Sequence, residues 1–251
     1  MCRAMNAKYL FAVWIVNILK VQAIIPGIPS AINNHPFQVA LLSNDKFIGG
    51  GVIIERNIVL SDINAYNQLL LQYLWPSTPV KLTIRAGSSN NNEGGQVVNV
   101  ARTVLVKIPE NEWNDLSVSI LLLENNLTFS DTIKKIGLAK ELPSSLPLNC
   151  SISGWGYTRN DYVNLPIQLQ VGRAMLVEDR NCNVTEPNNY LCLTGADACI
   201  GDSGGPLVCG GELVGLASDL QHCGTTTFTG SYNKIPLLYD RIMDVVKGIK
   251  G

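Results

Sequence analysis

Short stretches rich in β-branched and aromatic residues, separated by turn-type sequences such as "SSNNNEGG" and "NVTEPNN", make up most of the chain. Residues 116–120, "LSVSI", alternate apolar and polar positions, which predicts a strand buried on one face only. Many short strands at this spacing favour an all-β fold, either a sandwich or barrels. The predicted strands cover residues 37–42, 47–54, 81–87, 96–106, 116–120, 150–156, 169–177 and 212–218.

The last part of the chain follows a helical period. We predict a C-terminal helix over about residues 235–250 that packs on the body of the protein, an interpretation we prefer to a membrane or partner helix. Its apolar positions are Ile235, Leu238, Ile242, Val245, Val246 and Ile249.

The first 23 residues have the pattern of a secretory signal peptide. Arg3 and Lys8 precede the apolar run "YLFAVWIVNIL", and Val21 and Ala23 supply the small residues that signal peptidase requires, so we expect cleavage after Ala23. The run is shorter than the ~20 residues of a membrane span, and a buried N-terminal helix is the alternative. Residues 24–251 then carry 16 basic and 20 acidic side chains. Their net charge of −4 favours neither a nucleic-acid nor a membrane partner.

Cysteine usage agrees with export. Six cysteines follow residue 23, an even number that suggests disulfides, although six allow 15 pairings and none shows the paired spacing of a zinc site. Glycosylation sequons occur at Asn126, Asn149 and Asn183. The Asn149 sequon contains a cysteine, which we expect to make it a poor acceptor. The six cysteines are Cys150, Cys182, Cys192, Cys199, Cys209 and Cys223.

The stretch "GDSGGP", residues 201–206, is the strongest chemical signal in the sequence. A serine hydroxyl that attacks a carbonyl needs backbone N–H groups to hold the resulting oxyanion. Glycine allows the tight turn that points those groups inward. Here Ser203 is the candidate nucleophile, and the N–H groups of Gly201 and Ser203 are the candidate oxyanion donors.

With "PFQVAL", "GGGVI", "RAGSSNNNEGG", "NDLSVSILL", "SGWG" and "GDSGGPLV" in this order, the chain resembles the trypsin/chymotrypsin-like serine proteases, in particular arthropod trypsins, over residues 24–251. The resemblance implies two six-stranded antiparallel barrels, at about 24–136 and 137–234, with the site between them and a C-terminal helix. It also implies three disulfides, which join Cys150 to Cys209, Cys182 to Cys192, and Cys199 to Cys223.

The family's catalytic triad is incomplete in this chain. Ser203 matches the nucleophile and Asp115 the aspartate that orients the histidine, but Asn64 stands at the histidine position. Ala65 and Ile48 replace the two cysteines of a family disulfide, so both halves of that bridge are missing together. Ser203 and Asp115 can also persist as packing and hydrogen-bonding residues, which we consider the better interpretation.

An asparagine amide takes no proton near neutral pH, whereas imidazole titrates near pH 6.5. Loss of the catalytic base can lower turnover by about 10⁶, as it does in subtilisin. By family geometry neither His35 nor His222 reaches the nucleophile. Asp62 lies two residues before Asn64, where its carboxylate would lie beside Asp115. We therefore expect no proteolysis.

Asp197 matches the pocket-floor aspartate that binds Arg or Lys side chains in trypsins. Ser218 and Gly230 also keep their family positions. The pocket wall "SDLQHC", residues 218–223, departs from the family pattern, and Leu220 replaces a glycine at the mouth. Altered ligand recognition and drift after the loss of catalysis are two alternative explanations of this change, to which we give equal weight.

The N-terminus of the mature chain suggests a further ion pair. In the family a freed amine pairs with the aspartate before the serine, which implies a pair between Ile24 and Asp202. Ala23, and not Arg or Lys, precedes Ile24, so signal peptidase alone would create this amine with no zymogen stage. Pro26 replaces a family glycine, and its fixed φ opposes the insertion.

We expect a secreted, monomeric, catalytically inactive homologue that binds proteins or peptides, including proteases or their inhibitors, as a competitor, scaffold or regulator. The alternatives are an active, atypical endopeptidase that cleaves after Arg or Lys, and a secreted protein with a structural or bulk role. No cofactor or metal is expected, because the turn "SSNNNEGG" offers only Glu93 to a hard cation.

Overall fold

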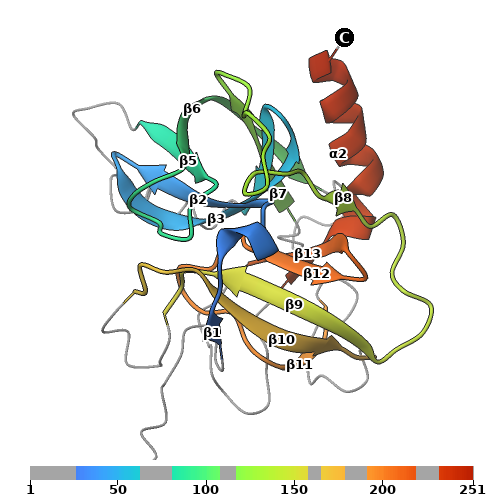
Figure 1. Ribbon diagram of the computed structural model, residues 1–251. Coiled ribbons are helices and arrows are strands. Elements are labelled where there is room, and N and C mark those ends of the chain that lie inside the picture. Colours follow the sequence, from blue (N-terminus) through green and yellow to red (C-terminus); the bar gives the residue numbers. More distant parts are fainter. Residues whose placement is uncertain are drawn as a thin grey trace, which may run out of the picture.

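The computed structural model describes residues 27–62, 81–107, 117–157, 165–178, 191–218 and 232–250. These residues form two β-sheet bodies, one above the other in Figure 1, with a helix along one side. The all-β fold with a C-terminal helix is confirmed. Within the described part, no helix is long and apolar enough to cross a membrane.

The first body is a closed six-stranded barrel with the strand order β2-β3-β4-β7-β6-β5. Its interior is apolar and fully buried, with Val39, Ile53 and Ile84 at 0% exposure. Apolar residues on the other face of several strands pack against the second body and the helix, so these strands are buried on both faces. The strands are β2 (Gln38–Ser43), β3 (Lys46–Glu55), β4 (Ile58–Ser61), β5 (Leu82–Ala86), β6 (Gln96–Lys107) and β7 (Ser117–Leu123).

Burial of both faces corrects one sequence expectation. The alternation in "LSVSI" predicted a strand with one exposed face, but Ser117 and Ser119 of β7 are only 4% and 3% exposed. The carbonyl of Ser117 accepts a hydrogen bond from Asn233 of the second body, 2.8 Å away. The polar face of this strand therefore meets protein and not water.

The second body is an eight-stranded sheet with the path β1-β10-β9-β12-β13-β14, to which β11 adds beside β10 and β8 beside β13. Residues 28–29, before the first barrel in sequence, belong to this sheet, because β1 pairs with β10. The strands are β1 (Ile28–Pro29), β8 (Gly137–Leu138), β9 (Leu148–Gly154), β10 (Gln170–Leu176), β11 (Leu193–Gly195), β12 (Pro206–Cys209), β13 (Glu212–Ala217) and β14 (Tyr232–Lys234).

The expected second six-stranded barrel is not confirmed, because this sheet does not close in the described part of the chain. Its ends approach each other at β11 and β14, which have three residues each. Among the described residues, a backbone hydrogen bond from Leu191 N–H to the Tyr232 carbonyl, at 3.4 Å, lies between the two ends. No strand pairing between β11 and β14 is found in this part of the chain.

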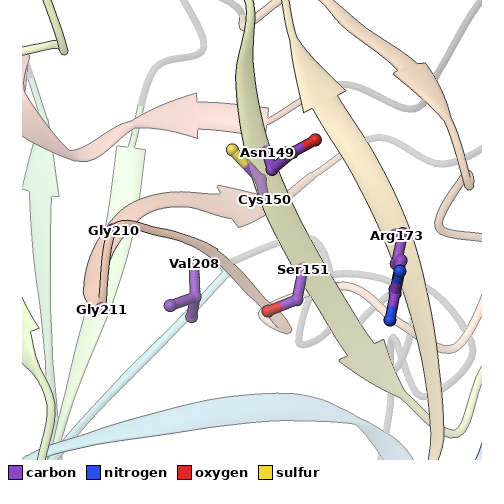
Figure 2. A pocket seen from close by; sticks show the side chains of 7 residues that line it. All are labelled: Asn149, Cys150, Ser151, Arg173, Val208, Gly210 and Gly211. Atoms are coloured by element: carbon purple, nitrogen blue, oxygen red, sulfur yellow. The ribbon is translucent and has the colours of Figure 1, made fainter.

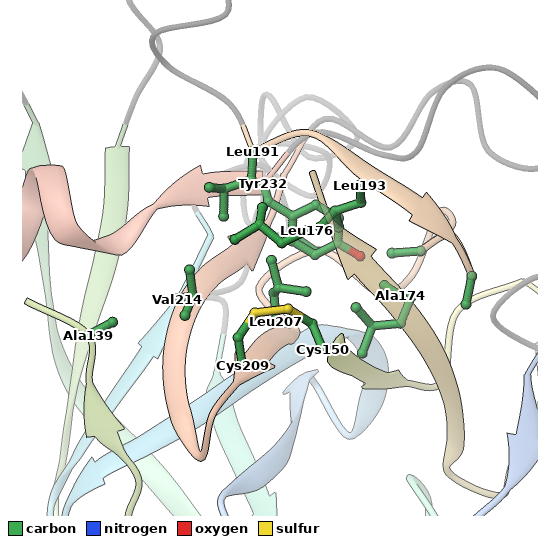
Figure 3. Close-up of a cluster of buried hydrophobic side chains, with 14 residues drawn as sticks. Ala139, Cys150, Ala174, Leu176, Leu191, Leu193, Leu207, Cys209, Val214 and Tyr232 are labelled. Atoms are coloured by element: carbon green, nitrogen blue, oxygen red, sulfur yellow. A yellow bond between two sulfur atoms is a disulfide. The ribbon is translucent and has the colours of Figure 1, made fainter. Parts of the chain in front are cut away.

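The core of the second sheet surrounds the disulfide between Cys150 and Cys209, the pair that the resemblance implies (Figure 3). Tyr232 and Leu207, both fully buried, lie in the same cluster. Cys192 and Cys199 are also disulfide-bonded, and their expected partners, Cys182 and Cys223, lie outside the described residues.

The helix α2 (Ile235–Lys250) confirms the C-terminal prediction, and its apolar face packs where the two bodies meet. Ile235, Leu238 and Ile242 are fully buried against residues of both bodies. The short 3-10 helix η1 (Ile32–Asn34) connects β1 to the first barrel.

Candidate functional site

The nucleophile turn, residues 199–205, is a tight backbone structure that holds Ser203 at 7% exposure. The Asp202 N–H donates to the Cys199 carbonyl at 2.8 Å, and the Gly205 N–H donates to the Asp202 carbonyl at 2.7 Å. Gly201 has a φ of +98°, and a Cβ there would lie 3.0 Å from the backbone of Gly156. The turn therefore requires glycine at position 201, the first of the two candidate oxyanion donors.

Both β-sheet bodies hold this turn. The Gly50 N–H of β3 donates to the Ser203 carbonyl at 2.8 Å, and the Ser61 hydroxyl of β4 donates to the Gly50 carbonyl at 2.7 Å. From the other body, the Gly204 N–H donates to the Ala217 carbonyl of β13 at 2.8 Å. Ser203 is thus fixed at the junction of the barrel and the second sheet, as the resemblance implies for a site between two bodies.

Asp202 is a buried carboxylate directly beside the nucleophile, with 1% exposure. One of its oxygens accepts a hydrogen bond from the Gly156 N–H at 2.6 Å, and the other from the Cys199 N–H at 3.0 Å. The pKa of Asp202 is raised to about 7, chiefly by burial and also by the charge of Asp197, against the two backbone donors, which lower it. A Cβ on Gly154 or Gly156 would overlap the carboxylate, so both glycines of "SGWG" make room for it.

The predicted pocket floor is also buried. Asp197 is 4% exposed and Ser218 is 3% exposed. Burial raises the pKa of Tyr232 well above its ordinary value, and the charges of Asp197 and Asp202 act in the same direction. The structure therefore brings Asp197, Asp202 and Tyr232 into one electrostatically coupled region beside the nucleophile turn.

Several predicted site residues lie outside the described part of the chain. They are the triad positions Asn64 and Asp115, the pocket residues Leu220 and Gly230, and the N-terminal Ile24. The described half of the site comprises Gly201, Asp202, Ser203, Asp197 and Ser218.

His35, which directly follows η1, is buried, with 8% exposure. Its ring lies edge-on to Phe37, with 6.2 Å between the centroids. Burial lowers the pKa of His35, so its neutral form is favoured in the folded protein.

A buried polar pair that the sequence did not predict lies beside the strand that leads to Asn64. Asp62 is 1% exposed, and its carboxylate accepts a hydrogen bond from the Asn233 side chain at 3.5 Å. The same amide donates to the Ser117 carbonyl at 2.8 Å. Asn233 thus joins β14 of the second sheet to β4 and β7 of the barrel. An aspartate in the apolar run "IVLSDI" was the available sequence signal for this pair.

The loop at residues 88–95 is organised around a guanidinium. Arg85 donates to three of its backbone carbonyls, those of Asn91 (3.2 Å), Asn92 (3.1 Å) and Gly94. The Ser89 carbonyl accepts a hydrogen bond from the Trp155 indole at 2.9 Å, which ties the loop to the second sheet next to Gly156. Among the described residues no group of three His, Cys, Asp or Glu side chains could hold a metal ion.

Comparisons with known proteins agree with this geometry. A sequence model of the family described as Trypsin matches residues 24–242. Trypsin delta of Drosophila erecta is 32% identical over 231 residues, which cover 84% of each chain. Hypodermin-A of Hypoderma lineatum is 27% identical over 83% of this chain and 82% of its own. The solved structure of neuropsin, a serine protease expressed in the limbic system of mouse brain, has a TM-score of 0.72 and 26% identity, over 88% of this chain and 98% of that chain.

Proposed function

Because the chain belongs to the trypsin family, we propose that it is a secreted, non-catalytic member that binds a protein or peptide through the region around Ser203 and Asp197. The observation that carries this proposal is Asn64 at the position of the family's general base. Ser203 is a weak nucleophile unless a base removes its proton.

The histidines of the chain support the same proposal. His35 is buried against Phe37, and burial favours its neutral, structural form. His222 abuts Cys223 in sequence, at the expected mouth of the pocket. Neither is a sequence match for the base, and the amide of Asn64 cannot store the proton that the reaction transfers.

The binding half of the site supports recognition of a basic side chain. Asp197 is a buried carboxylate, and a Lys or Arg side chain that reached it would form a charge-assisted hydrogen bond. The N–H groups of Gly201 and Ser203 would hold a carbonyl of the same ligand. A protease inhibitor or protease substrate with a Lys or Arg side chain on an exposed loop presents both groups, the cation and the carbonyl. The protein would then compete with active proteases or hold their partners.

An active, atypical endopeptidase is the second candidate, because the nucleophile turn is intact and the relatives are named trypsins. In this case a substitute base, for example the buried Asp62, would have to act on Ser203. The third candidate is a secreted protein with a structural or bulk role, which needs no ligand at Asp197.

Amidolysis of Arg and Lys peptide substrates by the Ile24 form distinguishes the first two candidates. We expect wild type to be no faster than Ser203→Ala, and Asn64→His to gain activity because the remaining site is built. A wild-type rate clearly above that of Ser203→Ala would mean that a substitute base exists.

Calorimetric titration with a peptide that copies an inhibitor loop, carries an Arg side chain and has no aldehyde group distinguishes a binding protein from one with only a structural role. We expect binding by wild type and its loss in Asp197→Asn, which removes the charge with little change in volume. Binding that survives in Asp197→Asn unchanged would contradict recognition through this carboxylate.

A further inference from the structure

A surface hollow of about 410 Å³ lies over strands β9, β10 and β12 of the second sheet (Figure 2). The register places Arg173 of β10, Ser151 of β9 and Val208 of β12 in one row across three strands. Asn149 comes two residues before Ser151 on the same face of β9. The lining residues are Asn149, Cys150, Ser151, Arg173, Val208, Gly210 and Gly211.

The hollow exists because the turn beside Asn149 has no side chains. Gly210 and Gly211 connect β12 to β13 with φ values of +62° and +88°, and a Cβ on either would meet no atom within 4 Å. Asn149 is exposed, and its pairing partner on β10, Met175, keeps 39% of its surface exposed. The space beside the Asn149 amide is therefore open to a bulky group.

All three residues of the sequon Asn149-Cys150-Ser151 line this hollow. We propose that Asn149 carries an N-linked glycan whose first sugar lies in the hollow, an inference that rests on the secretion included in the proposed function. The Asn149 amide nitrogen would form a bond to the anomeric carbon of a lipid-pyrophosphate-linked oligosaccharide. The bond from that carbon to the pyrophosphate oxygen breaks, the amide loses one proton, and the lipid pyrophosphate leaves.

The disulfide of Cys150 does not prevent this reaction, because it forms later. Cys209 follows Cys150 by 59 residues, and at 5–20 residues per second the two are synthesised roughly 3–12 s apart. Cys150 is also the first cysteine after Cys2, so no earlier cysteine of the mature chain can capture it. Asn149 would thus meet the oligosaccharide transferase while Cys150 is still a free thiol. The cysteine in the sequon then no longer makes Asn149 a poor acceptor.

The hollow suits the first sugar of a glycan. The guanidinium of Arg173 and the hydroxyl of Ser151 can bond to sugar hydroxyl and acetamido oxygens, and Val208 offers an apolar contact to the ring. Arg173 makes no ion pair with another residue in the described ranges. Asn126 is exposed as well, and it lines none of this hollow, so it is a matched reference site.

Site occupancy is the first measurement. The full chain would be secreted from cultured mammalian cells, digested, and treated with peptide N-glycosidase in heavy-oxygen water. We expect a labelled Asp at position 149 in wild type and its loss in Asn149→Gln. An unlabelled Asn149 with a labelled Asn126 would overturn the proposal and leave the proposed function intact. Retention of the chain in the cells, with no glycan at any sequon, would overturn secretion as well.

Contact with the hollow is the second measurement. Under native conditions we expect the glycosidase to release the Asn149 glycan roughly tenfold more slowly than the Asn126 glycan, the ratio that a modest binding energy gives. Arg173→Ala should remove this difference, while Arg102→Ala, an exposed change in the barrel, should keep it. Equal rates at both sites in wild type would overturn the placement of the sugar in the hollow.

Discussion

Adding one residue in front of Ile24 tests what the buried carboxylate of Asp202 needs. In a form that begins at Ala23, the amine of Ile24 is part of a peptide bond and cannot pair with Asp202. The carboxylate then depends on the N–H groups of Gly156 and Cys199, and its pKa of about 7 shows that burial outweighs them. A form that begins at Ile24 has the free amine that the proposed ion pair requires.

The raised pKa of Asp202 fixes the sign of the pH dependence. An acid whose pKa is higher in the folded state than in the unfolded state loses stability as pH rises through the interval between the two values, here 3.8 and about 7. The slope in that interval is about 1.4 kcal/mol per pH unit. Between about pH 5 and pH 7 the Ala23 form should therefore lose about 2 kcal/mol, or roughly 4–8 °C in melting temperature.

His35 changes the free energy of unfolding with pH in the direction opposite to Asp202. Its pKa is lowered by burial, so its contribution to stability is present above the unfolded value of 6.5 and is lost as pH falls. The Asp202 contribution is isolated by subtracting the same pH series for Asp202→Asn, in which His35 is unchanged.

Urea unfolding of both forms and of their Asp202→Asn variants, from about pH 5 to pH 7, gives the four series. We expect the difference between wild type and Asp202→Asn to fall with pH in the Ala23 form and to stay level in the Ile24 form, because an ion pair lowers the carboxyl pKa. A level difference in the Ala23 form would refute the assignment of a buried, uncompensated carboxylate. Parallel slopes in the two forms would refute insertion of Ile24.

Two further substitutions, Arg85→Met and Gly154→Ala, test the packing around the site, and each has a matched control. Arg85→Met removes a guanidinium that donates to three loop carbonyls and should cost roughly 2 kcal/mol in urea unfolding; Arg102→Met, an exposed change, should cost almost nothing, and equal losses would contradict the role of the loop. Gly154→Ala should prevent correct folding or lower the melting temperature strongly, because its Cβ overlaps a buried carboxylate. Gly248→Ala, in open space on the helix, should instead stabilise the chain by about 0.5–1 kcal/mol. A mild effect of Gly154→Ala in the same melting series would contradict the crowding around that carboxylate.

Long strands and the helix could be predicted from the sequence because their patterns are local. The apolar positions of α2 repeat at helical spacing, the run of β6 is rich in β-branched residues, and that of β2 is mostly apolar. β4 and β12 have four residues each, too few for a periodic signal, and their pairing partners define them. The serines of β7 gave a false exposed face, because a second body covers the barrel there.

The nucleophile half of the site could be predicted because one short motif holds it. Gly201, Asp202 and Ser203 are consecutive, and hydrogen bonds within the turn, from Asp202 to Cys199 and from Gly205 to Asp202, join near neighbours in the sequence. The contacts of Asn233 could not be predicted in this way, since its partners Ser117 and Asp62 lie 116 and 171 residues away. Only the folded arrangement of the two bodies brings them together.

The hydrogen bond between Leu191 and Tyr232, at 3.4 Å, also has a dynamic consequence. It lies beside strands of three residues each, so we expect the sheet to open there early and the Leu191 amide to exchange early with solvent. Asp197, the predicted pocket floor, follows β11, and Tyr232 begins β14, so this join lies next to the predicted floor. Ser203 is anchored elsewhere, through Gly50 and through the neighbouring Gly204. Opening of this join would change the residence time of a basic ligand while the nucleophile turn keeps its shape.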